Sequence, residues 1–125
     1  MKPVFILDTN IFIYLFAGSL KEPLPDKVLG YSVITEIELL SYPGLSQKDE
    51  RQIRKLLSEM NHIALTKEIK RQTIQIRKKY KIKLPDAIIS ATAIVNNATL
   101  LTNDEQLLAI PSLKASSLDI QNEEF

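Results

Sequence analysis

Four acidic residues of this sequence fall where their carboxylates could act on one ligand. Asp8 directly follows the apolar run Pro3–Leu7, and Asp104 lies just past a later apolar run. Asp86 stands where a helix is expected to begin, and Glu38 lies within an earlier expected helix. Separated acids at one edge of a sheet suit a divalent cation, because Mg²⁺ prefers hard oxygen ligands and keeps several of its waters.

Electrostatic repulsion between such acids also favours a cation. Two carboxylates about 4 Å apart repel by roughly 4 kcal/mol at an effective dielectric near 20. A metal-free cluster would have to hold protons through raised pKa values. A divalent ion removes this cost, makes a bound water more acidic and stabilises charge on a phosphate under attack. The four acids therefore predict a Mg²⁺ or Mn²⁺ site.

Each acid also has a purely structural interpretation. Asp8 and Asp104 could cap the helices that follow them, and Asp86 could be a first-turn acid favoured by the helix dipole. Glu38 stands three residues after Thr35, which is the spacing of a capping box. We favour the shared site, because the four positions recur in one topological place.

The elements around these acids alternate between strand and helix. Ser46 and Thr66 are expected helix N-caps, and Pro85 fits a first helical position. The alternation predicts a three-layer α/β/α domain with a central parallel sheet of about four to five strands, whose working site lies at the carboxyl ends of the strands. Strands are expected at 3–7, 28–31, 62–65, 99–101 and 113–116, and helices at 11–16, 32–41, after 46, after 66, from 84 and through 107.

Composition narrows the class of protein. The chain has 125 residues, 45% of them hydrophobic and none of them Cys, which predicts one domain, no disulfide and a cytoplasmic location. No apolar run approaches a membrane span, and the first residues leave no room for a signal peptide. The net charge is only +1, yet the segment Lys67–Lys83 holds eight basic residues and one acid. This segment is either a solvated helix surface or a basic face.

Other catalytic chemistries lack their residues. The only histidine is His62, and there is neither a nucleophile elbow nor a phosphate-binding glycine loop. A phosphotransfer domain remains an alternative, although the phosphatase class wants an acid where this chain has Asn10. A receiver domain wants a Lys at the end of its last strand, whereas Lys114 lies before or inside that strand.

Four motifs resemble those of the PIN-domain family, in order and over essentially the whole chain. They are Leu7–Asn10, Ser32–Leu40, Leu84–Ala93 and Leu101–Asp104. The resemblance implies a single PIN domain over residues 1–125, and short chains of this kind are similar to VapC toxins. It therefore implies a Mg²⁺- or Mn²⁺-dependent endoribonuclease that acts as the toxin of a toxin–antitoxin pair, binds a cognate antitoxin and forms a homodimer. A non-catalytic interaction module with the same fold remains the alternative.

The resemblance also assigns roles to single residues. Asp8, Glu38, Asp86 and Asp104 match the catalytic and metal-binding acids of the family. Glu36 competes with Glu38 for the second position, and two residues apart on a helix only one can face the site. Thr9, Asn10 and Thr102 match its supporting polar residues. The charge of the basic segment, and not the resemblance, makes Lys78, Lys79, Lys81 and Lys83 the candidate RNA contacts. The candidates for the dimer interface are Ile11, Phe12, Tyr14, Leu15 and Phe16, although packing in the core explains most of them equally well.

Overall fold

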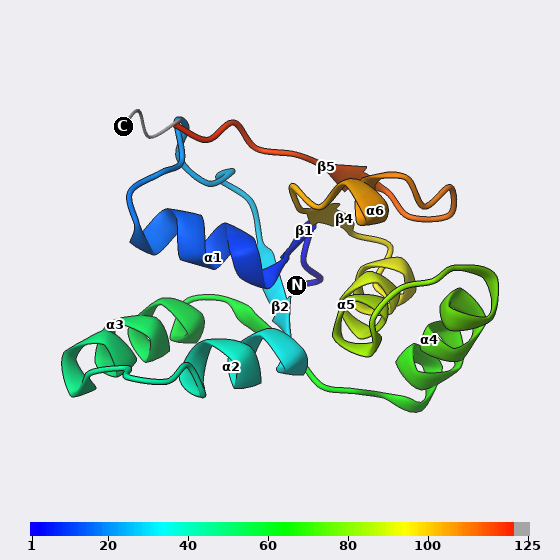
Figure 1. The fold of residues 1–125 in the computed structure, drawn as a ribbon, viewed down its shortest axis with the longest axis horizontal. Coiled ribbons are helices and arrows are strands. Elements are labelled where there is room, and N and C mark those ends of the chain that lie inside the picture. Colours follow the sequence, from blue (N-terminus) through cyan, green and yellow to red (C-terminus); the bar gives the residue numbers. More distant parts are fainter. Residues whose placement is uncertain (122–125) are drawn as a thin grey trace.

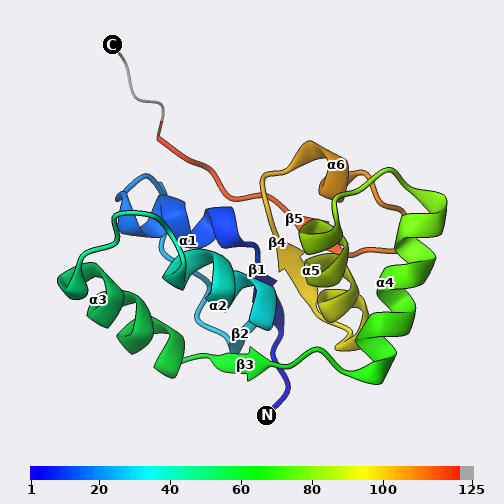
Figure 2. The same ribbon diagram turned by 60° about the horizontal axis from the view of Figure 1, so that its bottom comes forward.

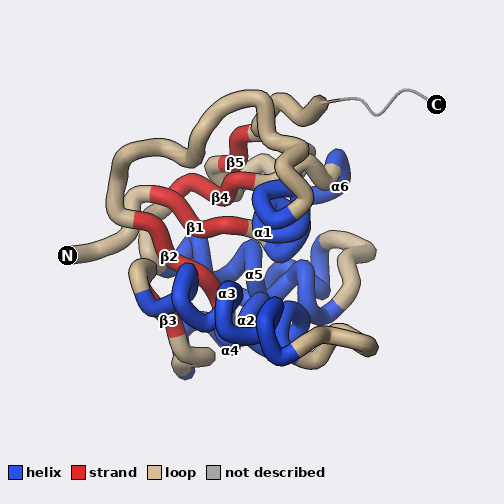
Figure 3. Tube along the Cα trace, turned by 90° about the vertical axis from the view of Figure 1, so that its left-hand side faces the viewer, coloured by secondary structure: helices blue, strands red, loops and turns tan. Residues whose placement is uncertain are grey.

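Five parallel strands form the central sheet of the computed structural model, which describes residues 1–121. The strand order is β3-β2-β1-β4-β5, so the first strand lies in the middle (Figure 3). The chain adds β2 and β3 on one side of β1 and then crosses over to add β4 and β5 on the other side. The strands are β1 (Phe5–Leu7), β2 (Leu29–Ser32), β3 (Asn61–Ile63), β4 (Thr99–Leu101) and β5 (Ala115–Ser116).

Successive side chains of the central strands enter different cores, because a strand alternates its faces. Ile6 and Leu100 pack with α4 and α5. Leu7 and Leu101 pack with α1 and α3 on the other side. The two helix layers stand on opposite sides of the strands in Figures 1 and 2, which confirms the predicted α/β/α architecture. The helices are α1 (Thr9–Phe16), α2 (Val33–Leu40), α3 (Gln47–Ser58), α4 (Lys67–Lys79), α5 (Leu84–Val95) and α6 (Glu105–Leu108).

Three predicted helix starts are confirmed. The Ser46 hydroxyl accepts from the Asp49 N–H at the start of α3, and the Thr66 hydroxyl accepts from the Ile69 N–H at the start of α4. Pro85 occupies the first turn of α5, where its missing N–H has no helical partner to lose.

The capping box that was the structural alternative for Glu38 does not form. The N-cap is Ser32, whose hydroxyl accepts from the Ile34 N–H. Thr35 is instead an interior helix residue with 0% exposure. The helix begins earlier than that interpretation required because β2 runs directly into it.

The candidate dimer interface is also wrong in part. Ile11 and Phe12 are both 0% exposed and fill the core beneath α1, so they are not surface residues. Phe16 remains largely exposed, whereas Tyr14 and Leu15 are half-buried. Among residues 1–121, no helix is both long and apolar enough to cross a bilayer.

Candidate active site

The predicted acids lie at the carboxyl edge of the three central strands. β1 lies between β2 and β4, and the chain changes direction across the sheet at β1 and β4. Ligands of open α/β sheets bind in the crevice at such a switch point. Asp8 follows β1 and Thr102 follows β4, so both border this crevice.

Asp8 is buried and held through both carboxylate oxygens. Its Oδ1 accepts from the Thr9 N–H at 2.8 Å, which makes Asp8 the N-cap of α1. Its Oδ2 accepts from the Thr102 hydroxyl at 2.7 Å. Burial raises the pKa of Asp8, and Asp104 and Glu38 raise it further, while the bonds from Thr102 and Thr9 oppose the rise. The structural interpretation of Asp8 as a cap thus holds beside its place in the site.

Asp104 is tied to the same network from β4. The Thr102 hydroxyl accepts from the Asp104 N–H at 3.0 Å, while Asp104 Oδ1 accepts from the Gln106 N–H and caps α6. The neighbouring Asn103 side chain exchanges two hydrogen bonds, each 2.9 Å long, with the backbone of Leu118. These hydrogen bonds anchor the loop that carries Asp104 to α6 and to the backbone of Leu118.

Glu38 faces the site, and Glu36 faces away from it. Glu38 Oε1 accepts from the Thr9 hydroxyl at 2.7 Å, and this hydroxyl also lies 3.0 Å from the Thr35 hydroxyl. Glu36 Oε1 instead lies 3.5 Å from His62 Nε2 on the edge strand β3. The two glutamates diverge because successive helix positions point in different directions.

Asp86 lies in the first turn of α5 and is the least restrained of the four acids. Burial raises its pKa, and the charges of Asp8, Asp104 and Glu38 raise it further, while Lys83 lowers it. Asp8, Asp104 and Glu38 are therefore each close enough to Asp86 for their charges to act on its carboxyl group. No group of the described residues donates a hydrogen bond to Asp86, so its carboxylate is free to take a proton or a cation.

A groove of about 840 Å³ opens between α1, α2 and α3 beside three of the four acids, and Asp104 does not line it. Asp8, Glu38 and Asp86 line it with Asn10, the predicted supporting residue. Sequence reasoning missed Asp49, which it treated only as a first-turn acid of α3. The apolar part of the lining includes Ile13, Phe16, Leu39, Tyr42, Leu45 and Ile53.

The oxygen donors suit a hard divalent cation, although they do not enclose one. Within residues 1–121, no three acidic or histidine side chains are close enough to form a ready-made ligand cluster. Mg²⁺ is commonly held by one or two carboxylates and retains several waters, so an open arrangement is compatible with it. The unbonded Asp86 carboxylate and its raised pKa indicate a place where positive charge would be stabilised.

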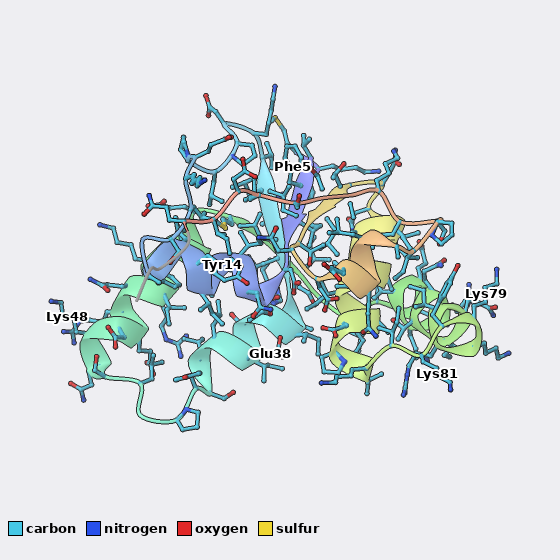
Figure 4. All side chains as sticks on the ribbon, turned by 45° about the horizontal axis from the view of Figure 1, so that its top comes forward. Phe5, Tyr14, Glu38, Lys48, Lys79 and Lys81 are labelled. Carbon is cyan, nitrogen blue, oxygen red and sulfur yellow. The ribbon has the colours of Figure 1, made fainter. Side chains whose placement is uncertain are left out.

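The basic segment reaches this site at one end only. Lys83 precedes α5 and lowers the pKa of Asp86. Lys79 and Lys81 lie at the outer edge of the molecule, away from Glu38 (Figure 4). Lys78 is also exposed, in the last turn of α4.

The position of Lys114 argues against a receiver-type phosphotransfer site. Its ammonium donates to Asn97 Oδ1 at 2.9 Å. Asn97 precedes β4, so this contact lies at the amino edge of the sheet, opposite the acids.

Comparison with known proteins places the chain in a family. The sequence model of the PIN domain matches residues 5–113. A chain from a toxin–antitoxin complex of Klebsiella pneumoniae is 33% identical, with a TM-score of 0.73 over 86% of this chain and 93% of that chain. A chain of VapBC-1 from nontypeable Haemophilus influenzae is 28% identical, with a TM-score of 0.74 over 90% of this chain and 96% of that chain. No significant match occurs among curated protein sequences.

The chain thus belongs to the PIN-domain family. A third similar structure, VapBC2 from Rickettsia felis bound to a promoter DNA fragment, is 26% identical, with a TM-score of 0.74 over 92% of this chain and 98% of that chain. Within the family, the chain is a VapC-like PIN-domain protein.

Proposed function

We propose that this protein is a Mg²⁺- or Mn²⁺-dependent endoribonuclease that acts as the toxin of a toxin–antitoxin pair in the cytoplasm. The observation that carries the proposal is the convergence of Asp8, Glu38, Asp86 and Asp104 at the switch point of the sheet. The toxin–antitoxin neighbours support the biological role.

Some residues of the candidate site would bind the cation, and others hold those residues in orientation. Asp8, Asp86, Asp104 and Glu38 would hold the cation, while the hydroxyls of Thr9 and Thr102 fix the orientation of Glu38 and Asp8. A divalent ion supplies, when bound, an acidified water and charge stabilisation at the phosphate. In hydrolysis, the water oxygen bonds to phosphorus, the bond from phosphorus to the leaving sugar oxygen breaks, and that oxygen gains a proton.

Cleavage of single-stranded RNA by the purified protein tests this proposal. We expect cleavage with Mg²⁺ or Mn²⁺, none with excess chelator, and none by the Asp8→Asn variant purified in parallel. Asn is as good an N-cap as Asp, so this substitution preserves the start of α1 while removing the charge. Equal Mn²⁺ affinity of the two proteins in titration calorimetry would contradict the assigned metal site.

The same cleavage assay distinguishes the proposed nuclease from the alternative function. A non-catalytic interaction module would leave RNA intact with either metal and would still bind a partner. Co-expression with the product of a neighbouring short reading frame tests the antitoxin, because a cognate partner should co-purify and suppress cleavage. Light scattering tests the proposed homodimer, and a monomer at micromolar concentration would contradict it.

A further inference from the structure

Thr35 forms a hydrogen bond that sets it apart from two other buried helical threonines, Thr73 and Thr92. The hydroxyls of Thr73 and Thr92 each donate, at 2.7 Å, to the carbonyl four residues earlier in their own helix. This is the usual way for a helical Thr to satisfy its hydroxyl. The Thr35 hydroxyl, with 0% exposure, instead lies 3.0 Å from the Thr9 hydroxyl on α1.

The chemistry of the three groups fixes the direction of this contact. An ionised carboxylate can only accept, so the single proton of the Thr9 hydroxyl is committed to Glu38 Oε1 at 2.7 Å. Thr9 must then accept from Thr35. The result is a directed chain from the Thr35 hydroxyl through the Thr9 hydroxyl to the Glu38 carboxylate.

We propose that Thr35 is a positioning residue, which aims the Thr9 hydroxyl so that Glu38 presents its second oxygen to the crevice. A Thr hydroxyl can occupy more than one staggered rotamer, and a donor from α2 selects one of them. Oε1 of Glu38 is engaged by Thr9, which leaves Oε2 as the oxygen available to a ligand. The role of this chain in cleavage rests on the proposed function, whereas its geometry does not.

The spacing of the residues explains why one helix serves both ends of the chain. Thr35 and Glu38 are three positions apart and therefore lie on the same face of α2. This face turns toward the start of α1, where Asp8 and Thr9 stand. A buried hydroxyl in this place orders the site without touching a substrate.

A set of matched variants tests the proposal. Thr35→Val keeps the shape but removes the hydroxyl, Thr35→Ser restores the hydroxyl, and Thr73→Val removes another buried hydroxyl, on α4, a helix that carries none of the four acids. We expect Thr35→Val to lower kcat for RNA cleavage about 10-fold with little change in KM, which is the size of effect typical of residues that orient ligands. Thr35→Ser and Thr73→Val should stay close to wild type. A Thr35→Val loss no larger than that of Thr73→Val would overturn the proposal.

A measurement independent of activity separates this proposal from the proposed function. The ¹³C resonance of the Glu38 carboxyl carbon, in the metal-free protein, should move in Thr35→Val and in Thr9→Val, and return in Thr35→Ser. If Thr35→Val leaves it unchanged while the protein cleaves RNA, the positioning role is wrong and the nuclease stands. If the resonance moves but wild type cleaves no RNA, the hydrogen-bonded chain stands and the nuclease is wrong.

Discussion

The acids on the two sides of the crevice are held in different ways. On the β1 and β4 side, Asp8 and Asp104 accept backbone N–H groups, cap helices and share the Thr102 hydroxyl. On the α5 side, Asp86 receives no hydrogen bond from the described residues and faces three other acids. The first pair serves the fold as well as the site through hydrogen bonds, whereas the charge of Asp86 contributes to the fold only through the dipole of α5, in whose first turn it lies. We therefore propose that Asp86 is the acid whose charge is most available to a ligand.

The largest expected effect comes from removing that charge. Asp86→Asn should reduce RNA cleavage and Mn²⁺ affinity by about 100-fold, the upper range for loss of a group that holds a metal in place. Folding should be intact, because no hydrogen bond depends on this carboxylate. Cleavage rates and titration calorimetry measure the effect, with circular dichroism as the control. Retention of wild-type activity would break the distinction between the two sides.

Substitution of Glu38 on α2 should give the next largest effect on RNA cleavage. Glu38→Gln should lower cleavage by about 10-fold or more, because its oxygen faces the crevice. Glu36→Gln should leave cleavage unchanged, since Glu36 faces His62. Parallel kinetics of the two variants decide the matter. Loss of activity in Glu36→Gln alone, with the fold intact, would show that the second motif is wrongly aligned.

The pH dependence of stability sharpens the comparison without any substrate. Burial and neighbouring acids raise the pKa of Asp86 above its ordinary value of 3.8, so the folded chain binds this proton more tightly than the unfolded chain. The resulting stabilisation is complete below the ordinary value and is lost as pH rises through the raised pKa. In urea unfolding of metal-free protein, the free energy of unfolding of Asp86→Asn should therefore increase relative to that of wild type as pH rises. A constant difference across the acidic range would contradict the shift.

The smallest expected effect concerns the basic segment. Lys78→Glu with Lys79→Glu should weaken RNA binding broadly and reduce its salt dependence by about one charge per lost phosphate contact, without moving the cleavage position. Lys83→Ala should weaken RNA binding more than either of these single substitutions, because Lys83 is the lysine whose charge lowers the pKa of Asp86. Lys48→Ala, on the opposite side of the molecule, is the matched control (Figure 4). An unchanged salt slope would remove this segment from the RNA path.

The sequence predicted those features that depend on local patterns. Short apolar runs located the strands, and the caps at Ser46 and Thr66 located two helix starts. The order of strands and acids then placed the candidate site at the carboxyl edge. The fold class could therefore be predicted from the sequence without knowing how the side chains pack.

Features that depend on packing between helices escaped sequence reasoning. The burial of Ile11 and Phe12 follows from how α1 lies on the sheet, which an apolar run alone does not reveal. The bond from Thr35 to Thr9 requires α1 and α2 to meet at one point, so Thr35 was considered only as a cap. Its spacing from Glu38 was the available signal, because it placed both residues on one face.

The bond between Thr102 and Asp8 joins residues 94 positions apart, and it bears on the order in which the candidate site can form during synthesis. The central strand β1 is synthesised well before its partner β4, because more than 90 residues separate them in the chain. A growing chain that stops before residue 99 has Asp8, Glu38 and Asp86 but lacks β4, Thr102 and Asp104, so Asp8 has only one of its two restraints. A translation product that stops there therefore carries three of the four acids of the candidate site but lacks β4, the strand that leads to the fourth.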